Sequence, residues 1–189
     1  MTRYSARPVR ELYELAGSTA PVPGDGVVTA LTAMLGVGLV LKSIRITLKH
    51  ADLPALRAAE PRLEAIAAAF EADADEDARA FSGFIAAGRL PKATAQQAAV
   101  RARRHDAAAA ASARAALDTL AHANAAVRAA RRVRGLIAPV MAPDMAAGLR
   151  LLHVVRRNAI ENARGNLEEM SASPEHARLV RALQRLSAA

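Results

Sequence analysis

The sequence predicts an all-α protein, in which a bundle of long helices surrounds a central apolar helix rich in glycine and alanine. Hydrophobic residues make up 52% of the 189 residues, whereas aromatic residues make up only 3%. Alanine supplies much of the hydrophobic fraction, and it favours helix and lets helices pack closely. Residues with branched β-carbons cluster only at 27–46 and 154–160. Neither cluster alternates with polar residues as a half-buried strand would. The length suits a single domain over residues 1–189.

Three helices are predicted in the first half of the chain. A short helix over 8–16 stops at Gly17. A loop rich in proline and glycine follows at 20–26 and leads directly into an apolar helix over 26–48. Pro54 then suits the first turn of a helix over 54–87. Small residues on one side of the apolar helix predict that a neighbouring backbone lies there: Ala30, Ala33, Gly36 and Gly38.

The second half is predicted to contain four helices. Thr94 caps a helix over 95–121, and Asn124 starts another that ends near 137. Pro143 lies in the next loop, and a long helix over 144–170 follows it. Ser173 begins a terminal helix. An acidic block at 71–78 in the first half is expected to be a solvated face unless one carboxylate points inward.

Three asparagines occur at helical spacing in the last long helix. Asn158, Asn162 and Asn166 follow one another every four residues, so they line one face. Asparagine is a poor helix former because its side chain competes for the backbone. The stripe is therefore either a solvated polar face or a row of amides that contact a neighbouring helix or a ligand.

The formal net charge of +8 favours an anionic partner. The basic residues are spread over several helices without interleaved aromatic residues. Nucleic-acid binding is therefore the weakest functional hypothesis. The histidines lack the spacing of a metal site. The sequence contains no cysteine, which excludes thiol catalysis and disulfides and fits a cytoplasmic protein.

Neither secretion nor a membrane span is expected from the N-terminal region. Charged residues stand where a signal peptide needs an apolar core. The apolar run over 27–41 is shorter than the ~18–20 residues that a membrane span needs.

Several short motifs occur in the order typical of one family. The loop APVPGDG at 20–26 resembles an APxPGGGS loop, and DARAF at 77–81 with LPK at 90–92 resembles a DAEAF stretch with an LPK turn. PDMA at 143–146 and NARGN at 162–166 take the places of an SDAG helix start and an NVxxN pair. The chain thus resembles, over nearly its whole length, the cyclodeaminase/cyclohydrolase family. That family includes the cyclodeaminase domain of formiminotransferase-cyclodeaminase and the methenyltetrahydrofolate cyclohydrolases.

The resemblance implies an all-α homodimer that binds a tetrahydrofolate derivative as substrate, without a tightly bound cofactor. The implied reaction is either ring opening of methenyl-tetrahydrofolate by water or ring closure of formimino-tetrahydrofolate with loss of ammonia. Both reactions move a proton to or from nitrogen beside a cationic centre, and a carboxylate can do this. Asp144, at a helix start, is the first catalytic candidate, and Asp77 is the second.

The expected substrate-binding residues lie in three places along the chain. Gly24 and Gly26 allow close approach to the backbone, and the helix start favours an anionic group. The basic charge suits a folate with a glutamate tail. The full set comprises Pro23, Gly24, Asp25 and Gly26 in the loop, Lys49 after the apolar helix, and Asn162 and Asn166 in the last long helix.

Departures from the family pattern keep a second function open. Asp25 replaces the middle glycine of the loop, Val27 replaces a serine, and Lys49 is the one lysine left of a lysine-rich segment. Asp25 either caps the apolar helix or obstructs a ligand on the bare backbone. The alternative function is therefore a family member without catalysis that acts as a helical ligand-binding or assembly protein.

Overall fold

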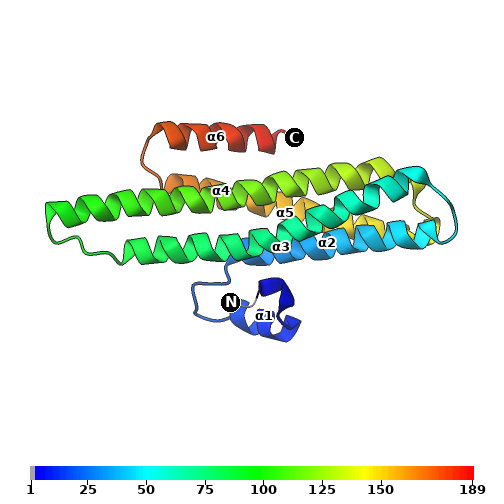
Figure 1. The fold of residues 1–189 in the computed structure, drawn as a ribbon, viewed down its shortest axis with the longest axis horizontal. Coiled ribbons are helices and arrows are strands. Elements are labelled where there is room, and N and C mark those ends of the chain that lie inside the picture. The colour runs from blue at the N-terminus through cyan, green and yellow to red at the C-terminus, as the bar shows by residue number, and fades with distance from the viewer. Residues whose placement is uncertain (1–2) are drawn as a thin grey trace.

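The computed structural model describes residues 3–189, and in that range every regular element is helical. Figure 1 shows long helices side by side in an elongated bundle, with a short helix on either side of it. The bundle helices are α2 (Asp25–Leu48), α3 (Pro54–Gly88), α4 (Ala95–Val133) and α5 (Ala142–Glu168). The flanking helices are α1 (Val9–Ala16) and α6 (Pro174–Ser187). Short 3₁₀ turns occur at η1 (Tyr4–Ala6), η2 (Arg134–Leu136) and η3 (Pro139–Met141). The predicted all-α class is confirmed.

Two helix starts follow the sequence predictions. The Thr94 hydroxyl accepts a hydrogen bond from the backbone N–H of Gln97, and the Gln97 side chain accepts one in return from the N–H of Thr94. The Ser173 hydroxyl accepts from the N–H of His176 at the start of α6. Such bonds satisfy backbone donors that a helix start leaves unpaired.

The predicted break at 121–124 is wrong, because α4 runs continuously from Ala95 to Val133. No glycine or proline interrupts this stretch, so nothing ends the helix there. Asn124 is buried within it and does not cap a new helix. Its side-chain amide donates to the carbonyl of Leu186 (2.8 Å) and accepts from Arg156, so it fastens α6 to the bundle.

The main hydrophobic core lies between the four long helices. Phe70, Leu63 and Ile44 are fully buried in it. The backbones of α2 and α5 come very close where Gly36 faces Gly148, since a Cβ on Gly148 would lie 2.6 Å from the carbonyl oxygen of Gly36. Gly38, by contrast, faces open space, so the predicted neighbouring backbone does not extend to it.

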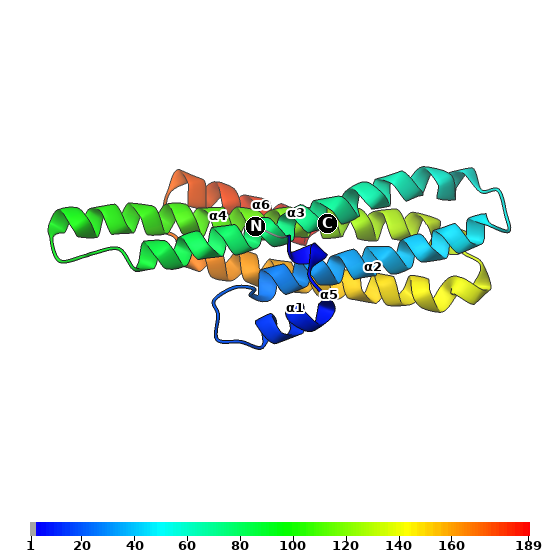
Figure 2. The same ribbon diagram turned by 60° about the horizontal axis from the view of Figure 1, so that its bottom comes forward.

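The burial of α2 accounts for its apolar sequence. By length and composition alone α2 could cross a membrane, and 56% of its most apolar window is buried inside the structure. Figure 2 shows α2 and α5 lying side by side, while the end of α3 and the start of α4 extend beyond them as a helical hairpin. A helix that is buried on two sides in a protein core has an apolar sequence even without a membrane, so the sequence of α2 does not require one.

The N-terminal segment is fastened to the middle of α3. The backbone N–H of Tyr4 donates to Asp75 (3.1 Å), and Arg3 forms an ion pair with Glu71 (2.9 Å). The Tyr4 ring is buried against Val27 of α2 and Ala74 of α3. These contacts cover the region in which α2 begins.

Candidate functional site

The loop before α2 places backbone N–H groups at the helix start. Gly24 is the N-cap residue, with an extended backbone and no side-chain cap hydrogen bond. Pro23 is buried, and its peptide bond to Val22 is cis. Asp25 is the first residue inside the helix and is exposed, so the expectation that its side chain caps the helix is wrong. A side chain at that position has already passed the cap.

Gly26 lies directly against the carboxylate of Asp77. A Cβ built on Gly26 would stand less than 3.0 Å from both carboxylate oxygens, a distance that real side chains do not show. Asp77 reaches this place from the middle of α3, where the acidic block of the sequence lies. The absence of a side chain at position 26 is therefore what admits this carboxylate to the first turn of α2.

The pKa of Asp77 is raised from 3.8 to about 6. Burial is the main cause, and the negative charge of Asp25 is the second. The backbone N–H of Val27 and the side chain of Asn162 oppose the shift because both stabilise the charged carboxylate. Asp77 thus ionises close to neutral pH, which suits proton transfer.

Two of the three asparagines of α5 form a chain that ends at Asp77. The Nδ2 group of Asn166 donates to Oδ1 of Asn162 (2.6 Å). With its oxygen occupied, Asn162 presents its amide N–H groups to the Asp77 carboxylate. Asn158 is exposed and lies outside this chain. The predicted stripe is therefore a solvated face at Asn158 and a row of partly buried amides beyond it.

A second pair of charged side chains lies one turn away on α3. Nδ1 of His122 in α4 contacts Oδ2 of Asp73 at 2.8 Å, and only 7% of Asp73 is exposed. The hydrogen bond to Asp73 raises the pKa of His122, and the charges of Asp73 and Asp118 add to the effect. Burial raises the pKa of Asp118. Phe70 packs edge-on against the imidazole, with ring centroids 6.0 Å apart.

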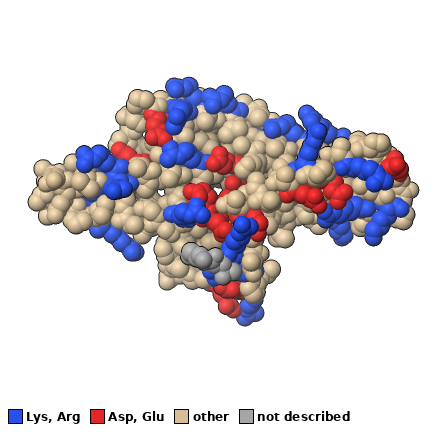
Figure 3. Space-filling view, viewed as in Figure 1, with Lys and Arg blue, Asp and Glu red and all other residues tan. Residues whose placement is uncertain are grey.

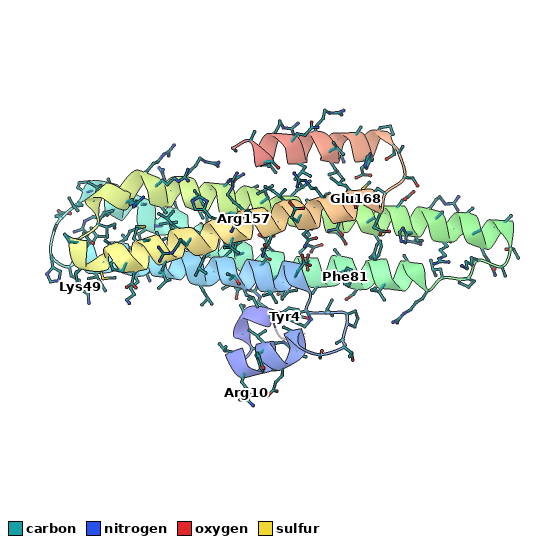
Figure 4. The ribbon with its side chains drawn as sticks, turned by 180° about the vertical axis from the view of Figure 1, so that it is seen from behind. Tyr4, Arg10, Lys49, Phe81, Arg157 and Glu168 are labelled. Carbon is teal, nitrogen blue, oxygen red and sulfur yellow. The ribbon has the colours of Figure 1, made fainter. Side chains whose placement is uncertain are left out.

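The structure does not bring Asp144 or Lys49 to the Asp77 group within one chain. Asp144 forms an ion pair with Lys42 (2.8 Å), seventeen residues after Asp25 on α2. At 1.5 Å per residue that separates the two ends by roughly 25 Å. Lys49 follows the last residue of α2, and Figure 4 shows it at the far end of the bundle from Tyr4 and Phe81.

The whole set of helices and loops corresponds to a known family. A sequence profile of the formiminotransferase-cyclodeaminase family matches residues 8–185. The chain belongs to this family. The crystal structure of formiminotetrahydrofolate cyclodeaminase from Thermotoga maritima has the same fold, with a TM-score of 0.84 over 97% of this chain and 89% of that one. The two sequences are 16% identical. A comparison with curated protein sequences found no match.

The family motifs of formiminotransferase-cyclodeaminase fall at the two ends of α2. The APVPGDG loop, the DARAF stretch and the NARGN pair meet at the start of α2. The PDMA motif starts α5 at the opposite end, where Asp144 pairs with Lys42. Within residues 3–189 no three histidine, aspartate or glutamate side chains are grouped so as to hold a metal ion.

Sequence reasoning did not find the pair of Asp73 and His122. The only signal was the spacing of two aspartates, Asp73 and Asp77, one helical turn apart in the acidic block. That spacing places Asp73 and Asp77 on the same side of α3, but it does not show which neighbouring helix each of them faces. Figure 3 shows acidic side chains gathered around the middle of the bundle, where a surface hollow is lined by Asp73, Asp75 and Glu76.

Proposed function

We propose that this protein is a folate-dependent one-carbon enzyme that closes the ring of formimino-tetrahydrofolate and releases ammonia. The observation that carries the proposal is the Asp77 carboxylate at the first turn of α2, with a pKa of about 6. Family membership supports a folate-related cyclodeaminase-type protein. The hydrolysis of methenyl-tetrahydrofolate is the related reaction that the same site could support, because it also moves a proton at the folate nitrogens.

Asp77 is proposed to be the catalytic acid and base. As a carboxylate it accepts the proton from the folate nitrogen that attacks the carbon of the protonated formimino group, so that the attack leaves a neutral amino group on that carbon. As a carboxylic acid it returns that proton to the amino nitrogen, which leaves as ammonia when the carbon–nitrogen bond breaks. A pKa near 6 allows both forms at neutral pH. The ionised form also stabilises the cationic methenyl product.

The neighbouring residues are proposed to hold the substrate against Asp77. Asn162, fixed by its hydrogen bond from Asn166, orients the carboxylate or the pterin ring. Pro23, Gly24 and Gly26 leave the backbone at the start of α2 open to close approach. Asp25 is proposed to tune Asp77, since its charge is the second cause of the raised pKa.

Asp144 and Lys49 receive no catalytic or binding role in this proposal. The ion pair of Asp144 with Lys42 joins the start of α5 to α2 and accounts for the acidic residue there. Its carboxylate also lies in the first turn of a helix, where negative charge is favourable. Of the two catalytic candidates from the sequence, the proposal therefore keeps the second, Asp77, and leaves out the first, Asp144.

We further propose that the protein is a cytoplasmic homodimer, as the family resemblance implies. The supporting observation is a set of exposed apolar side chains on α2 and α5, two helices that lie next to each other (Figure 2). Leu35 is 69% exposed, Val28 43% and Val154 39%. Burial of such residues against a second copy would remove apolar surface from water.

One observation favours the alternative function. Asp25 is exposed at the start of α2, and its charge opposes an anionic group at that helix end. A protein that has lost catalysis would bind a folate, or another ligand, without turning it over. The second candidate function is therefore a ligand-binding or assembly protein of the same fold.

The absorbance of methenyl-tetrahydrofolate distinguishes these functions in one experiment. With formimino-tetrahydrofolate as substrate, a cyclodeaminase makes this absorbance rise, whereas a cyclohydrolase accelerates its loss when methenyl-tetrahydrofolate is supplied. We expect the rise, and we expect Asp77→Asn to reduce it at least 100-fold. The matched control is Glu76→Gln, which neutralises the exposed preceding residue. No change with either substrate, together with folate binding by calorimetry, would favour the ligand-binding alternative.

A further inference from the structure

A separate groove lies between the start of α3 and the end of α4. It has a volume of about 380 Å³, within the range of roughly 300–1,000 Å³ found for small-molecule sites. Its apolar lining consists of five alanines together with Ile66 and Val133. Alanine side chains are short, so they leave the two helix backbones close to the groove.

Three arginines border this groove without a carboxylate partner. Arg62 comes from α3, while Arg128 and Arg132 lie one turn apart on α4. No ion pair involves any of the three within the part of the chain that the structure describes. Other arginines of the same region are paired, as Arg45 is with Glu60 and Arg57 is with Asp52. Figure 3 shows basic side chains at this end of the molecule, some of them next to acidic ones.

Helix structure alone does not account for the three charges. Arg132 lies in the last turn of α4, where a positive charge interacts favourably with the helix end. Arg128 precedes that turn, and Arg62 lies inside α3, so neither has this explanation. Like charges one turn apart repel each other. The groove also remains open with all three side chains in place, so they do not simply cover the alanines.

We propose that this groove binds an organic phosphate, with the phosphate groups on the three guanidinium groups and the organic part on the alanine floor. A phosphate monoester carries about −1.5 to −2 charges at neutral pH. A compact di- or triphosphate therefore balances three arginines in a groove of this size, whereas one carboxylate balances only one. Arginine also binds phosphate oxygens in pairs through its planar fork of N–H groups.

The start of α3 adds a further feature that favours an anion. Ala55 lies in the first turn of α3 and lines the groove, and Leu53, the residue just before the helix, provides no side-chain cap. Pro54 has no N–H, and the N–H groups of Leu56 and Arg57 donate to the carbonyl of Leu53. Among residues 54–57 this leaves the N–H of Ala55 without a backbone partner, at the positive end of the helix dipole. The arginines and the helix start thus act in the same direction.

The groove is independent of the proposed folate site. Arg62 and Asp77 are fifteen residues apart on α3, which corresponds to roughly 22 Å along the helix. A negative result in the enzyme assay would therefore not contradict phosphate binding in the groove. A lack of phosphate binding would likewise not contradict the proposed enzyme activity.

Isothermal titration calorimetry with ATP and with inorganic pyrophosphate, at physiological salt, tests the groove. We expect the wild-type protein to bind ATP more tightly than pyrophosphate, because pyrophosphate cannot use the alanine floor. The variant Arg128→Gln/Arg132→Gln should weaken ATP binding at least tenfold, and Arg62→Gln alone should weaken it by a smaller factor. The control Arg103→Gln/Arg104→Gln removes two exposed charges from the same helix and should change the Kd less than twofold.

Two results would overturn the proposal. One is no heat of binding with millimolar ATP for the wild-type protein. The other is equal weakening in the groove variant and in the control, which would mean that ATP responds to overall charge and not to this groove. Circular dichroism of each variant checks that the helices are intact, and Arg62→Gln gives an independent answer if the double variant does not fold.

Discussion

The Asp77 carboxylate of α3 lies against Gly26 in the first turn of α2, at the place where a side chain on residue 26 would lie. A Cβ on Gly26 would lie less than 3.0 Å from the Asp77 carboxylate oxygens. The contact joins the glycine-rich loop to the acidic block, and its two residues are 51 positions apart in the sequence. It also takes the carboxylate out of water, which is the main cause of its raised pKa.

Gly26→Ala should therefore displace Asp77 and lower the stability of the protein. We expect a loss of about 1–3 kcal/mol, typical of an overpacked site, and a melting temperature lower by several degrees. Gly38→Ala is the matched control, because it lies in the same helix and its Cβ would meet nothing within 4 Å. That substitution should stabilise the helix by up to ~1 kcal/mol. Differential scanning calorimetry measures both.

A second variant separates the steric cause from a general effect of alanine in the first turn. In the background of Asp77→Ala the space beside position 26 is vacant, so Gly26→Ala should cost little. The double-mutant cycle should give an interaction energy of about 1 kcal/mol or more. Strictly additive effects would show that the two residues do not share this space.

Asp77→Asn should stabilise the protein near pH 8. The folded protein holds the Asp77 proton with a pKa of about 6, against 3.8 for an ordinary aspartate. Its contribution to stability is thus complete below about pH 4 and is lost as the pH rises to about 6. A neutral amide avoids the buried charge, and we expect a gain of about 1–3 kcal/mol at pH 8 that vanishes near pH 4. Chemical denaturation at both pH values measures it, and an equal gain at both would contradict the assignment.

The fold was predictable to a large extent because helix signals in this chain are local. Thr94 and Ser173 act as caps through contacts within three residues, and their sequence patterns suffice to place them. Asn124 shows the limit, because its partners Leu186 and Arg156 come from α6 and α5. An asparagine that forms hydrogen bonds with distant helices cannot be distinguished, from the neighbouring sequence, from one that caps a helix start.

The candidate site was predictable only as a set of motifs. The glycine loop, Asp77 and Asn162 were all singled out, but their meeting depends on how α2, α3 and α5 pack. The preference for Asp144 rested on its position at a helix start, and the structure pairs it with Lys42 at the other end of α2. The position of Asp144 in the sequence does not determine which end of α2 it lies against, because that depends on how α5 packs on α2.

Asp25→Asn should shift the ionisation of Asp77 to lower pH. The charge of Asp25 is the second cause of the raised pKa of Asp77, and its removal makes the ionised form easier to reach. In the proposed enzyme the acidic limb of the pH profile of kcat/KM should move down by a fraction of a pH unit. Carboxyl NMR titration measures the same shift without turnover. Asp52→Asn, at an exposed residue remote from α3's acidic block, serves as the control.

The same position separates a working site from a blocked one. Tighter folate binding by Asp25→Gly, without a gain in turnover, would indicate that the carboxylate obstructs a site that no longer catalyses. An unchanged pKa of Asp77 in Asp25→Asn would remove the tuning role that we assign to this residue.

His122 should make stability fall as the pH rises above about 6.5. Its hydrogen bond to Asp73 raises the pKa of the imidazole above the ordinary value of 6.5. The protonated form therefore stabilises the fold fully below pH 6.5, and this contribution is lost as the pH passes the raised pKa. His122→Asn keeps a donor near the Nδ1 position without titrating, so its melting temperature should depend less on pH in this range. We expect a difference of about 1 kcal/mol, or roughly 2–4 °C.

Histidine NMR resonances and a matched variant decide whether this pH dependence belongs to His122. Its titration midpoint should lie above 6.5. The control variant is His50→Asn, which replaces an exposed imidazole just after the end of α2, away from the pair of Asp73 and His122. A wild-type slope in His122→Asn would assign the effect to other groups, among which Asp118 faces the same imidazole.

Leu35→Glu should convert the proposed dimer to a monomer. Leu35 is 69% exposed on α2, although the helix around it is apolar, and Val154 of the adjacent α5 is also exposed. A carboxylate cannot be buried against apolar residues without a large loss of free energy, so association through this face should fail while the fold of each chain is kept. Analytical ultracentrifugation should show a dimer for the wild type and a monomer for Leu35→Glu. Val140→Glu is the matched control, because Val140 is 78% exposed but lies in η3 at the end of the bundle. A wild-type monomer, or dissociation by both substitutions alike, would argue against an interface centred on α2 and α5.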